Sequence, residues 1–279
     1  MNTPSATARP LLTDREALLR HRARACRQGL ADFLHRFAAH EVQDRLLAVN
    51  RKFTSPAVIS GFPGLWSELL PGALSVADDP LLELSPGSHD LVIHALSLHW
   101  AEDPVGQIVQ SARALREDGL FIGICFGGRS LYELRAAMTQ AEAEIAGGLS
   151  PRILPMGEIR DLGGLLPRAG LALPVADQVT QQASYRDLFH LARDLRAMGE
   201  TNAMAARPRH PTRPAIFARA AQIMAENHPD RDNPSRVIAS FDLVFLTGWA
   251  PSETQQKPMR PGSATHSLAE ALNQARDRD

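Results

Sequence analysis

The sequence has 279 residues, of which 44% are hydrophobic, so the chain is long enough to bury the core of one large domain or two small ones. Its 30 basic and 31 acidic side chains give a formal charge of −1, which excludes the basic excess of a general nucleic-acid binder. Cys26 and Cys125 lie far apart in the sequence, as is typical of free thiols in a reducing compartment. No apolar leader is present, nor a window of about 18 apolar residues, so we expect a cytoplasmic chain with no transmembrane segment.

An arginine-rich run begins the first predicted helix. Residues 14–48 carry apolar side chains at helical spacing and no proline, and Gly29 divides them into two helices. The only acids within the arginine-rich run are Asp14 and Glu16. We interpret this run as a solvated helix face, with a patch that contacts a partner or a phosphate as the alternative. Its arginines are Arg15, Arg20, Arg22, Arg24 and Arg27.

A turn-forming sequence follows the first predicted strand. The apolar residues 56–59 enter the sequence Ser-Gly-Phe-Pro-Gly at 60–64, which predicts a strand that feeds a tight loop. A nucleotide-binding loop is one interpretation. However, the sequence is neither GxGxxG nor a P-loop, because Pro63 removes a backbone donor and no lysine follows. A short helix at 66–70 and a short strand at 73–77 are expected next.

The middle of the chain predicts a strand, a helix and a second strand. Residues 90–93 form a continuous apolar run that continues through residue 98, as expected of a strand that is buried on both faces of a parallel sheet. Asp103 and Pro104 indicate the start of a helix that we expect to end at Asp118-Gly119. Residues 120–126 are a second apolar run, so the three elements form a βαβ unit. The predicted fold class is therefore α/β.

The second half of the chain alternates helices with one late strand. Ser130 is predicted to cap a helix that ends at Gly147-Gly148, and residues 161–169 form a further short helix. Residues 185–228 have a helical pattern that is broken by glycine and proline. Residues 240–249 are apolar enough to form a buried strand near the end of the chain.

Three histidines, His89, His94 and His99, recur every five residues and invite a metal site. In a strand His94 faces away from the other two, and His89 and His99 lie roughly 33 Å apart at about 3.3 Å per residue, so we expect none. His99 and Trp100 follow a central strand, where open α/β sheets bind ligands, with packed rim residues as the alternative. Gly127-Gly128 after the next strand either allows close approach of a ligand or forms a plain turn.

Several motifs over residues 73–267 match those of a known family in order and spacing. The run 89–100, together with Arg113-Ala114-Leu115 and Asp118-Gly119, resembles class I methyltransferases that depend on S-adenosylmethionine (SAM), of the biotin-synthesis type. Later motifs are more specific and are similar to the methyltransferase-like family of mitochondrial complex I assembly factors and its bacterial relatives. They are FGG at 126–128, LYELR at 131–135, GGLSP at 147–151, DLG at 161–163, DLRAMGETN at 194–202, TGW at 247–249 and RPGSA at 260–264.

The resemblance implies a trimmed, Rossmann-like class I methyltransferase fold. Its last strand, residues 241–249, is expected to pair antiparallel with residues 175–184. The implied domain organisation is an N-terminal helical extension over 1–52, a methyltransferase-like domain over 53–250 with a helical insertion over 185–235 before the last strand, and a polar C-terminal tail over 251–279.

The resemblance also implies that SAM lies across the carboxyl ends of the first strands. In the family the first strand ends in an acidic residue and a GxGxG-like loop, and a second strand ends in a carboxylate that binds the ribose. This chain departs at both places, and a helix and a strand between Gly64 and Gly72 are missing. We therefore expect SAM binding to be weak or lost, and no catalytic residue is assigned. The candidate cofactor-binding residues are Gly61, Gly64, Asp78 as an adenine contact, His99, Trp100 and Gly127.

Two classes of function follow. The first is a SAM-dependent methyltransferase that acts on an unknown acceptor, a protein or a small molecule, chiefly by positioning the two reactants. The second is a binding or assembly factor that keeps the fold without the cofactor, by resemblance for respiratory complex I. A strand-end acid and a ribose acid would favour the first class, and their absence favours the second. The complete later motifs indicate that the chain still binds something, so we expect a protein substrate or an assembly partner.

Overall fold

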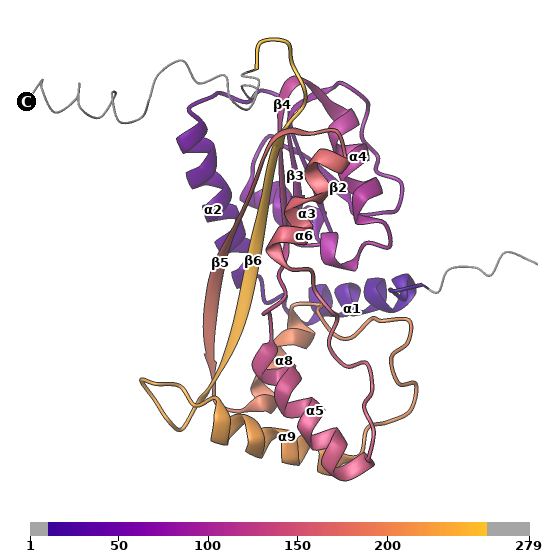
Figure 1. Ribbon diagram of the computed structural model, residues 1–279, viewed down its shortest axis with the longest axis vertical. Coiled ribbons are helices and arrows are strands. Elements are labelled where there is room, and N and C mark those ends of the chain that lie inside the picture. Colours follow the sequence, from indigo (N-terminus) through magenta and orange to yellow (C-terminus); the bar gives the residue numbers. More distant parts are fainter. Residues whose placement is uncertain (1–10, 256–279) are drawn as a thin grey trace, which may run out of the picture.

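A mixed sheet of six strands forms the centre of the molecule within residues 11–255, which are the residues that the computed structural model describes (Figure 1). The strand order is β2-β1-β3-β4-β6-β5, in which the first four strands are parallel and β6 is antiparallel to both of its neighbours. This arrangement confirms the Rossmann-like α/β class. The strands are β1 Pro56–Ser60, β2 Leu74–Ala77, β3 His89–Ala95, β4 Leu115–Phe126, β5 Ala172–Tyr185 and β6 Val237–Trp249.

Some parts of the sequence interpretation lie outside the described residues. These are the RPGSA motif at 260–264 and all but the first five residues of the predicted tail. The first ten residues of the predicted N-terminal extension also lie outside them.

The two predicted strand pairings are confirmed. Strands β3 and β4 are adjacent and parallel, with Val92 opposite Phe121, and both of these side chains are fully buried. Strand β5 pairs antiparallel with β6 along almost its whole length, from Ala172 to Tyr185. Strand β3 ends at Ala95, three residues earlier than expected, because Leu96 adopts a φ of 48° and a 3₁₀ helix, η1 (Leu98–Trp100), follows.

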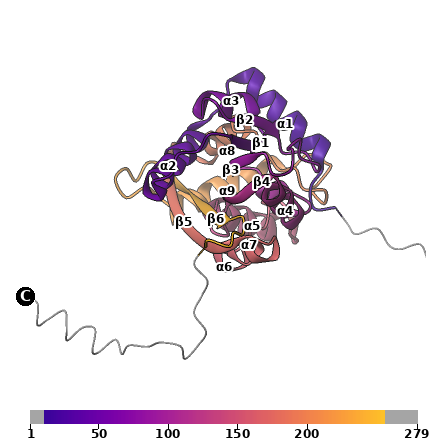
Figure 2. The same cartoon turned by 90° about the horizontal axis from the view of Figure 1, so that it is seen from above.

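Helices cover both faces of the sheet (Figure 2). On one face, Ala38 and Val42 of α2 (Phe33–Val49) pack in the same cluster as Ile93 and Ile122. On the other face, Ile108 of α4 (Pro104–Ala114) packs with Val92 and Phe121. The alternation of side chains along β3 supplies both clusters, which is why the whole strand is apolar. Short helices complete these layers: α3 Pro63–Leu69, α6 Ile159–Gly163 and α7 Leu165–Arg168.

The predicted helical insertion before the last strand consists of α8 (Leu188–Ala197) and α9 (Pro214–Asn227), which connect β5 to β6. Together with α5 (Tyr132–Ala146) they gather beyond one end of the sheet, in the lower half of Figure 1. Helix α5 contacts α9, and α8 contacts the N-terminal helix α1 (Arg15–Gln28).

The predicted end of the helix at Asp118-Gly119 is wrong. Helix α4 ends at Ala114, and β4 begins at once with Leu115, which pairs with His89. The backbone N–H groups of Gly87 and Ser88 donate to the carbonyl oxygens of Arg113 and Ala114. These bonds satisfy the last helical carbonyl groups, so the chain turns into the sheet earlier than its composition indicates.

The predicted N-cap at Ser130 is also wrong. Leu131 holds the N-cap position of α5 with a φ of 55°, while the Ser130 hydroxyl donates to the backbone oxygen of Asp242 in β6 and accepts from its N–H. The serine therefore ties the turn to the sheet. The single helix predicted at 161–169 is two short helices, α6 and α7, which meet at Gly164.

Candidate functional site

The N-terminal helix α1 crosses the carboxyl ends of the parallel strands (Figure 1). It begins at Asp14, whose side chain accepts a hydrogen bond of 3.0 Å from the Ala17 N–H. The pKa of Asp14 is held well below its usual range by that bond, by a further bond from Arg207 and by the charge of Arg207. Leu18 and Arg22 lie on the buried face of the helix. The interpretation of the arginine run as a solvated face therefore holds for Arg20 but is wrong for Arg22.

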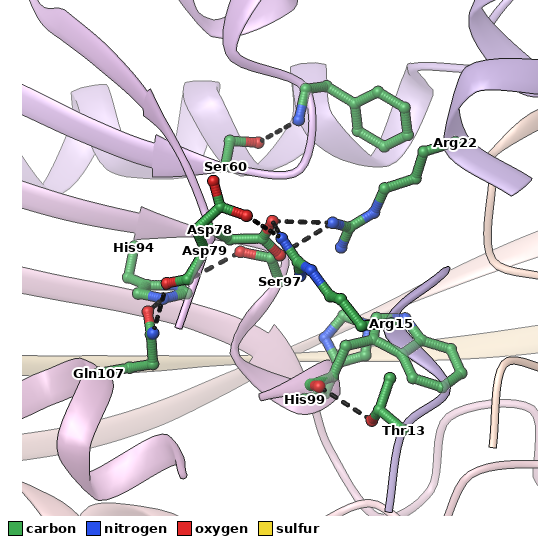
Figure 3. Close-up of polar contacts among 12 residues, drawn as sticks. Thr13, Arg15, Arg22, Ser60, Asp78, Asp79, His94, Ser97, His99 and Gln107 are labelled. Carbon is green, nitrogen blue, oxygen red and sulfur yellow. Dashed lines mark hydrogen bonds and ion pairs between the residues drawn. The ribbon is translucent and has the colours of Figure 1, made fainter. Parts of the chain in front are cut away.

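A buried carboxylate lies at the carboxyl end of β2 and is shared by two arginines (Figure 3). The Arg22 Nη1 donates to both oxygens of Asp78 at 2.9 Å, and the Arg15 Nη2 donates to Oδ1 at 2.9 Å. Arg15 also bonds the exposed Asp79 at 3.0 Å. Burial acts to raise the pKa of Asp78, but the charge of Arg22 and the hydrogen bonds of both arginines bring it below its ordinary value. The carboxylate is therefore ionised at neutral pH.

Arg22 also packs against the loop that follows β1. A Cβ atom at Gly61 would overlap the guanidinium group of Arg22, so only glycine lets this side chain lie against the loop backbone. The guanidinium also lies 5.8 Å from the centre of the Phe62 ring. The Phe62 N–H donates to the Ser60 hydroxyl at 3.1 Å, which turns the chain sharply after the strand.

A second polar cluster follows β3, and its acidic member comes from a distant part of the chain. Trp100 Nε1 donates to Glu200 Oε2 at 2.7 Å, and His99 Nε2 lies 3.3 Å from the same oxygen. Glu200 follows α8 directly after Gly199, whose φ of 78° turns the chain back toward the sheet. Burial acts to raise the pKa of Glu200, but interactions with His99, Arg22 and Trp100 bring it below its ordinary value. The Thr13 hydroxyl donates to the Trp100 carbonyl at 2.9 Å, which fixes the start of the N-terminal segment beside this cluster.

A cavity of about 290 Å³ adjoins Glu200 and Trp100. It lies between η1, the helices α5 and α8, and the segment 152–156. Its wall is mostly apolar and aromatic. The lining includes the side chains of Phe126, Leu134, Met138, Phe217 and Phe241.

The structure brings together four of the six residues that the sequence proposed. Gly61, Asp78, His99 and Trp100 follow the neighbouring strands β1, β2 and β3 and lie at one edge of the sheet. They form two groups, with Gly61 and Asp78 around Arg22 and with His99 and Trp100 around Glu200.

The other two residues have different surroundings. Gly64 is exposed in the first turn of α3, with open space where a Cβ atom would be. Gly127 follows β4, and a Cβ atom there would meet the side chains of Val244 and Asp242, so its close neighbour is strand β6.

Arg22 and Glu200 were not proposed as site residues. Arg22 was part of a run of similar arginines, and its helical spacing from Leu18 and Ala25 was the signal that could have placed it on the buried face. Glu200 was quoted within the DLRAMGETN motif, and that motif was the signal that could have found it. In the part of the chain that is described, no cluster of three or more His, Cys, Asp or Glu side chains could hold a metal ion. Nor is any described helix long and apolar enough to cross a membrane.

Comparison with known proteins places the sequence among methyltransferase-like proteins. It is 35% identical to the protein "Arginine-hydroxylase NDUFAF5, mitochondrial" of Danio rerio over 222 residues, which are 80% of this chain and 68% of that protein. This chain belongs to the class I methyltransferase-like family that includes NDUFAF5. The human protein of the same name is 38% identical over 72% of this chain and 57% of its own length.

A bacterial relative of this chain is named for a different activity. The malonyl-acyl-carrier-protein O-methyltransferase of Laribacter hongkongensis is 32% identical over 68% of this chain and 61% of that protein. The chain thus spans between 57% and 68% of the length of these three relatives. No protein-family model matches the sequence.

Solved structures of similar shape are distant in sequence. The YcgJ protein of Bacillus subtilis is 11% identical with a TM-score of 0.46, over 76% of this chain and 99% of that one. A SAM-dependent methyltransferase of Thermotoga maritima is 11% identical with a TM-score of 0.43, over 84% of this chain and 98% of that one.

Proposed function

We propose that this chain is a protein-binding factor of the methyltransferase-like family that works without SAM in its crevice, in the assembly of respiratory complex I. One observation carries the proposal. The guanidinium of Arg22 lies against the Gly61 backbone and donates to both oxygens of Asp78, in the place where the family resemblance puts the cofactor. The crevice residues thus bind one another, and the arrangement does not fit SAM.

The chemistry of the crevice supports the same conclusion. A SAM site needs a carboxylate for the ribose hydroxyls, and the sequence offers none at that place. Asp78, the candidate adenine contact, is occupied by Arg15 and Arg22. Strand β1 ends in Ser60 instead of an acid, and Pro63 lacks a backbone N–H. Each lost charged hydrogen bond costs about 1.5–3 kcal/mol, so two of them weaken binding by roughly two to four orders of magnitude.

Methyl transfer is the second candidate function, and the malonyl-acyl-carrier-protein O-methyltransferase relatives favour it. It requires helix α1 to withdraw Arg22 from the loop so that SAM enters. In that case the methyl group of SAM would pass to a nucleophile of the acceptor by in-line displacement. A measurement of whether the purified chain binds SAM therefore distinguishes the two candidate functions.

Isothermal titration of the full chain with SAM and with S-adenosylhomocysteine tests the proposal. We expect a dissociation constant of about 100 µM or weaker for either ligand, because the missing contacts weaken an ordinary micromolar site by at least about two orders of magnitude. A malonyl-acyl-carrier-protein O-methyltransferase titrated in the same buffer is the positive control. Micromolar binding of either ligand by this chain would contradict the proposal and support methyl transfer.

The protein partner is proposed from the relatives. The resemblance of the late motifs points to complex I assembly factors, and NDUFAF5 relatives are named arginine hydroxylases. Hydroxylation of arginine replaces a C–H bond by a C–OH bond and needs an oxygen donor and electrons. We therefore propose that this chain, like an assembly factor, recognises a protein partner. We do not propose that it hydroxylates arginine. The cytoplasmic location expected from the sequence belongs to the same proposal.

A further inference from the structure

One side of helix α1 carries arginines at helical spacing. Arg20, Arg24 and Arg27 follow one another at intervals of four and three residues, which places them on the same side of the helix. Arg196, near the end of α8, lies close enough to Arg24 for its positive charge to lower the pKa of Arg24. The contact between α1 and α8 therefore joins arginines of two helices into one surface (Figure 1). We call these four arginines the basic surface.

Arg24 is the member of the basic surface that is partly withdrawn from water. Its Nη2 donates to the Thr201 hydroxyl at 3.1 Å, whereas its Nε is buried and has no hydrogen-bond partner among the described residues. Burial is the main cause that lowers the pKa of Arg24, and the charges of Arg196 and Arg27 add to it. The guanidinium is still charged at neutral pH. Its described hydrogen-bond partner is thus a neutral hydroxyl, which does not balance the charge.

The loop after α8 fixes this part of α1. The Thr201 carbonyl oxygen lies 3.1 Å from His21 Nδ1, one helical turn before Arg24, so Thr201 contacts two side chains of the helix. Burial lowers the pKa of His21, and so do the positive charges of Arg24 and Arg207. The positive potential therefore extends along α1, on side chains that the neighbouring loop holds in place.

The acids around the basic surface already have other partners. Glu16 lies 3.5 Å from Arg20, and both of these side chains are exposed. The remaining neighbours are engaged as follows: Asp14 by Arg207 and Arg209, Asp78 by Arg15 and Arg22, Asp194 by the Tyr185 hydroxyl, and Glu200 by the Trp100 indole. Within residues 11–255, no acid forms an ion pair with Arg24, Arg27 or Arg196. Three positive charges of the basic surface are therefore without a counter-charge.

The extent of the basic surface favours a ligand with several negative groups. Arg20 and Arg27 are seven residues apart, which is roughly 10 Å along a helix that rises 1.5 Å per residue. One small anion does not span that distance, whereas successive carboxylates on a polypeptide do. The planar guanidinium also matches the two oxygens of a carboxylate, and such charge-assisted pairs are the strongest hydrogen bonds between side chains.

The composition of α1 argues against an anionic membrane as the ligand. A helix that lies on a membrane surface buries an exposed apolar face among the lipids. The apolar side chains of Ala17, Leu18 and Ala25 are instead buried inside this protein. Leu19 is the one large hydrophobic side chain of α1 that is exposed.

We propose that the basic surface docks an acidic segment of the protein partner, whose carboxylates pair with Arg24, Arg27 and Arg196. The proposal rests on the proposed function, because it states the chemistry by which the partner is recognised. Binding of an anionic membrane and binding of inorganic phosphate are outcomes that the test distinguishes.

Binding of short peptides to the full chain tests this proposal. The probe is the capped peptide Gly-Glu-Glu-Glu-Glu-Gly with a neutral dye, and the comparison peptide carries glutamine at the four glutamate positions. Fluorescence anisotropy measures each dissociation constant at about 50 mM sodium chloride, where surface charges are only partly screened. We expect the glutamate peptide to bind at least about tenfold more tightly than the glutamine peptide.

A double variant locates the binding site. Arg27→Gln with Arg196→Gln removes two exposed charges of the basic surface and should weaken binding of the glutamate peptide at least about fivefold, without disturbing the core. The matched control is Arg160→Gln with Arg231→Gln, which removes two exposed charges elsewhere and should leave binding unchanged. Circular dichroism spectra check that both double variants are folded.

Four results would overturn the proposal. They are equal binding of the glutamate and glutamine peptides, no binding of either peptide at millimolar concentration, equal losses in the two double variants, and displacement of the glutamate peptide by inorganic phosphate at equal concentration. Tighter binding to vesicles that contain phosphatidylglycerol than to the glutamate peptide would also overturn it, in favour of a membrane. The titration with SAM is a separate measurement, so a failure of the proposed function is distinguishable from a failure of this proposal.

Discussion

The substitution Asp78→Ala is expected to lower the free energy of unfolding by about 3–5 kcal/mol, the range that follows loss of one partner of a buried ion pair. The side chains of Asp78 and Arg22 are each only 4% exposed. Without the carboxylate, the guanidinium of Arg22 stays buried against the Gly61 loop and loses its one ion pair among the described residues. Urea unfolding followed by circular dichroism measures the change, with the midpoint and slope compared with those of the unsubstituted chain.

The neighbouring acid provides a matched control. Asp79 also bonds Arg15, at 3.0 Å, but its side chain is 54% exposed. Asp79→Ala should therefore change the free energy of unfolding by less than about 1 kcal/mol. Equal losses for the two alanine variants would show that Asp78 is not held as the buried partner of Arg22.

Lowering the pH from 7 to 5 should reduce the free energy of unfolding by about 2 kcal/mol through His35 alone. Burial lowers the pKa of His35 from 6.5 to about 4. Its Nδ1 accepts a hydrogen bond of 3.0 Å from Trp66 Nε1, which requires the neutral ring. Between these two pKa values the unfolded chain binds a proton that the folded chain does not, so stability falls as the pH falls through this window.

Other titratable groups do not reverse this loss of stability on acidification. Burial also lowers the pKa of His94 and of His21, so both histidines act in the same direction as His35. The pKa values of Asp78 and Glu200 are lowered from 3.8 and 4.5, so the stability that these carboxylates contribute is lost only at still lower pH. His35→Gln keeps an acceptor for Trp66 and does not titrate, so the variant should lose less stability on acidification. An unchanged unfolding midpoint between pH 7 and 5 would contradict this account.

The architecture was predictable because it depends on patterns that are local in sequence. The apolar residues at 91–95 and 120–126 lie in the central strands β3 and β4 and are buried on both faces of the sheet. Element ends were less predictable. The end of α4 depends on hydrogen bonds from Gly87 and Ser88, which lie some 25 residues earlier in the sequence.

The candidate site was predictable only in part, because some of its contacts join residues that lie far apart in the sequence. Gly61, Asp78, His99 and Trp100 follow strands, so the topology alone brings them to one edge of the sheet. Arg22 and Glu200 come from α1 and from the end of α8, and their places depend on how these helices pack across that edge. Helical spacing from Leu18 indicates the face of α1 on which Arg22 lies, but it does not reveal which carboxylate the arginine meets there.

A crystal structure of the full chain grown with an excess of S-adenosylhomocysteine tests the central claim most directly. The account predicts that the Arg22 guanidinium still bonds both oxygens of Asp78 and lies against Gly61, with no nucleoside between the loop after β1 and helix α1. A structure in which S-adenosylhomocysteine lies over Gly61, with Arg22 displaced and Asp78 turned toward the adenosine, would contradict it.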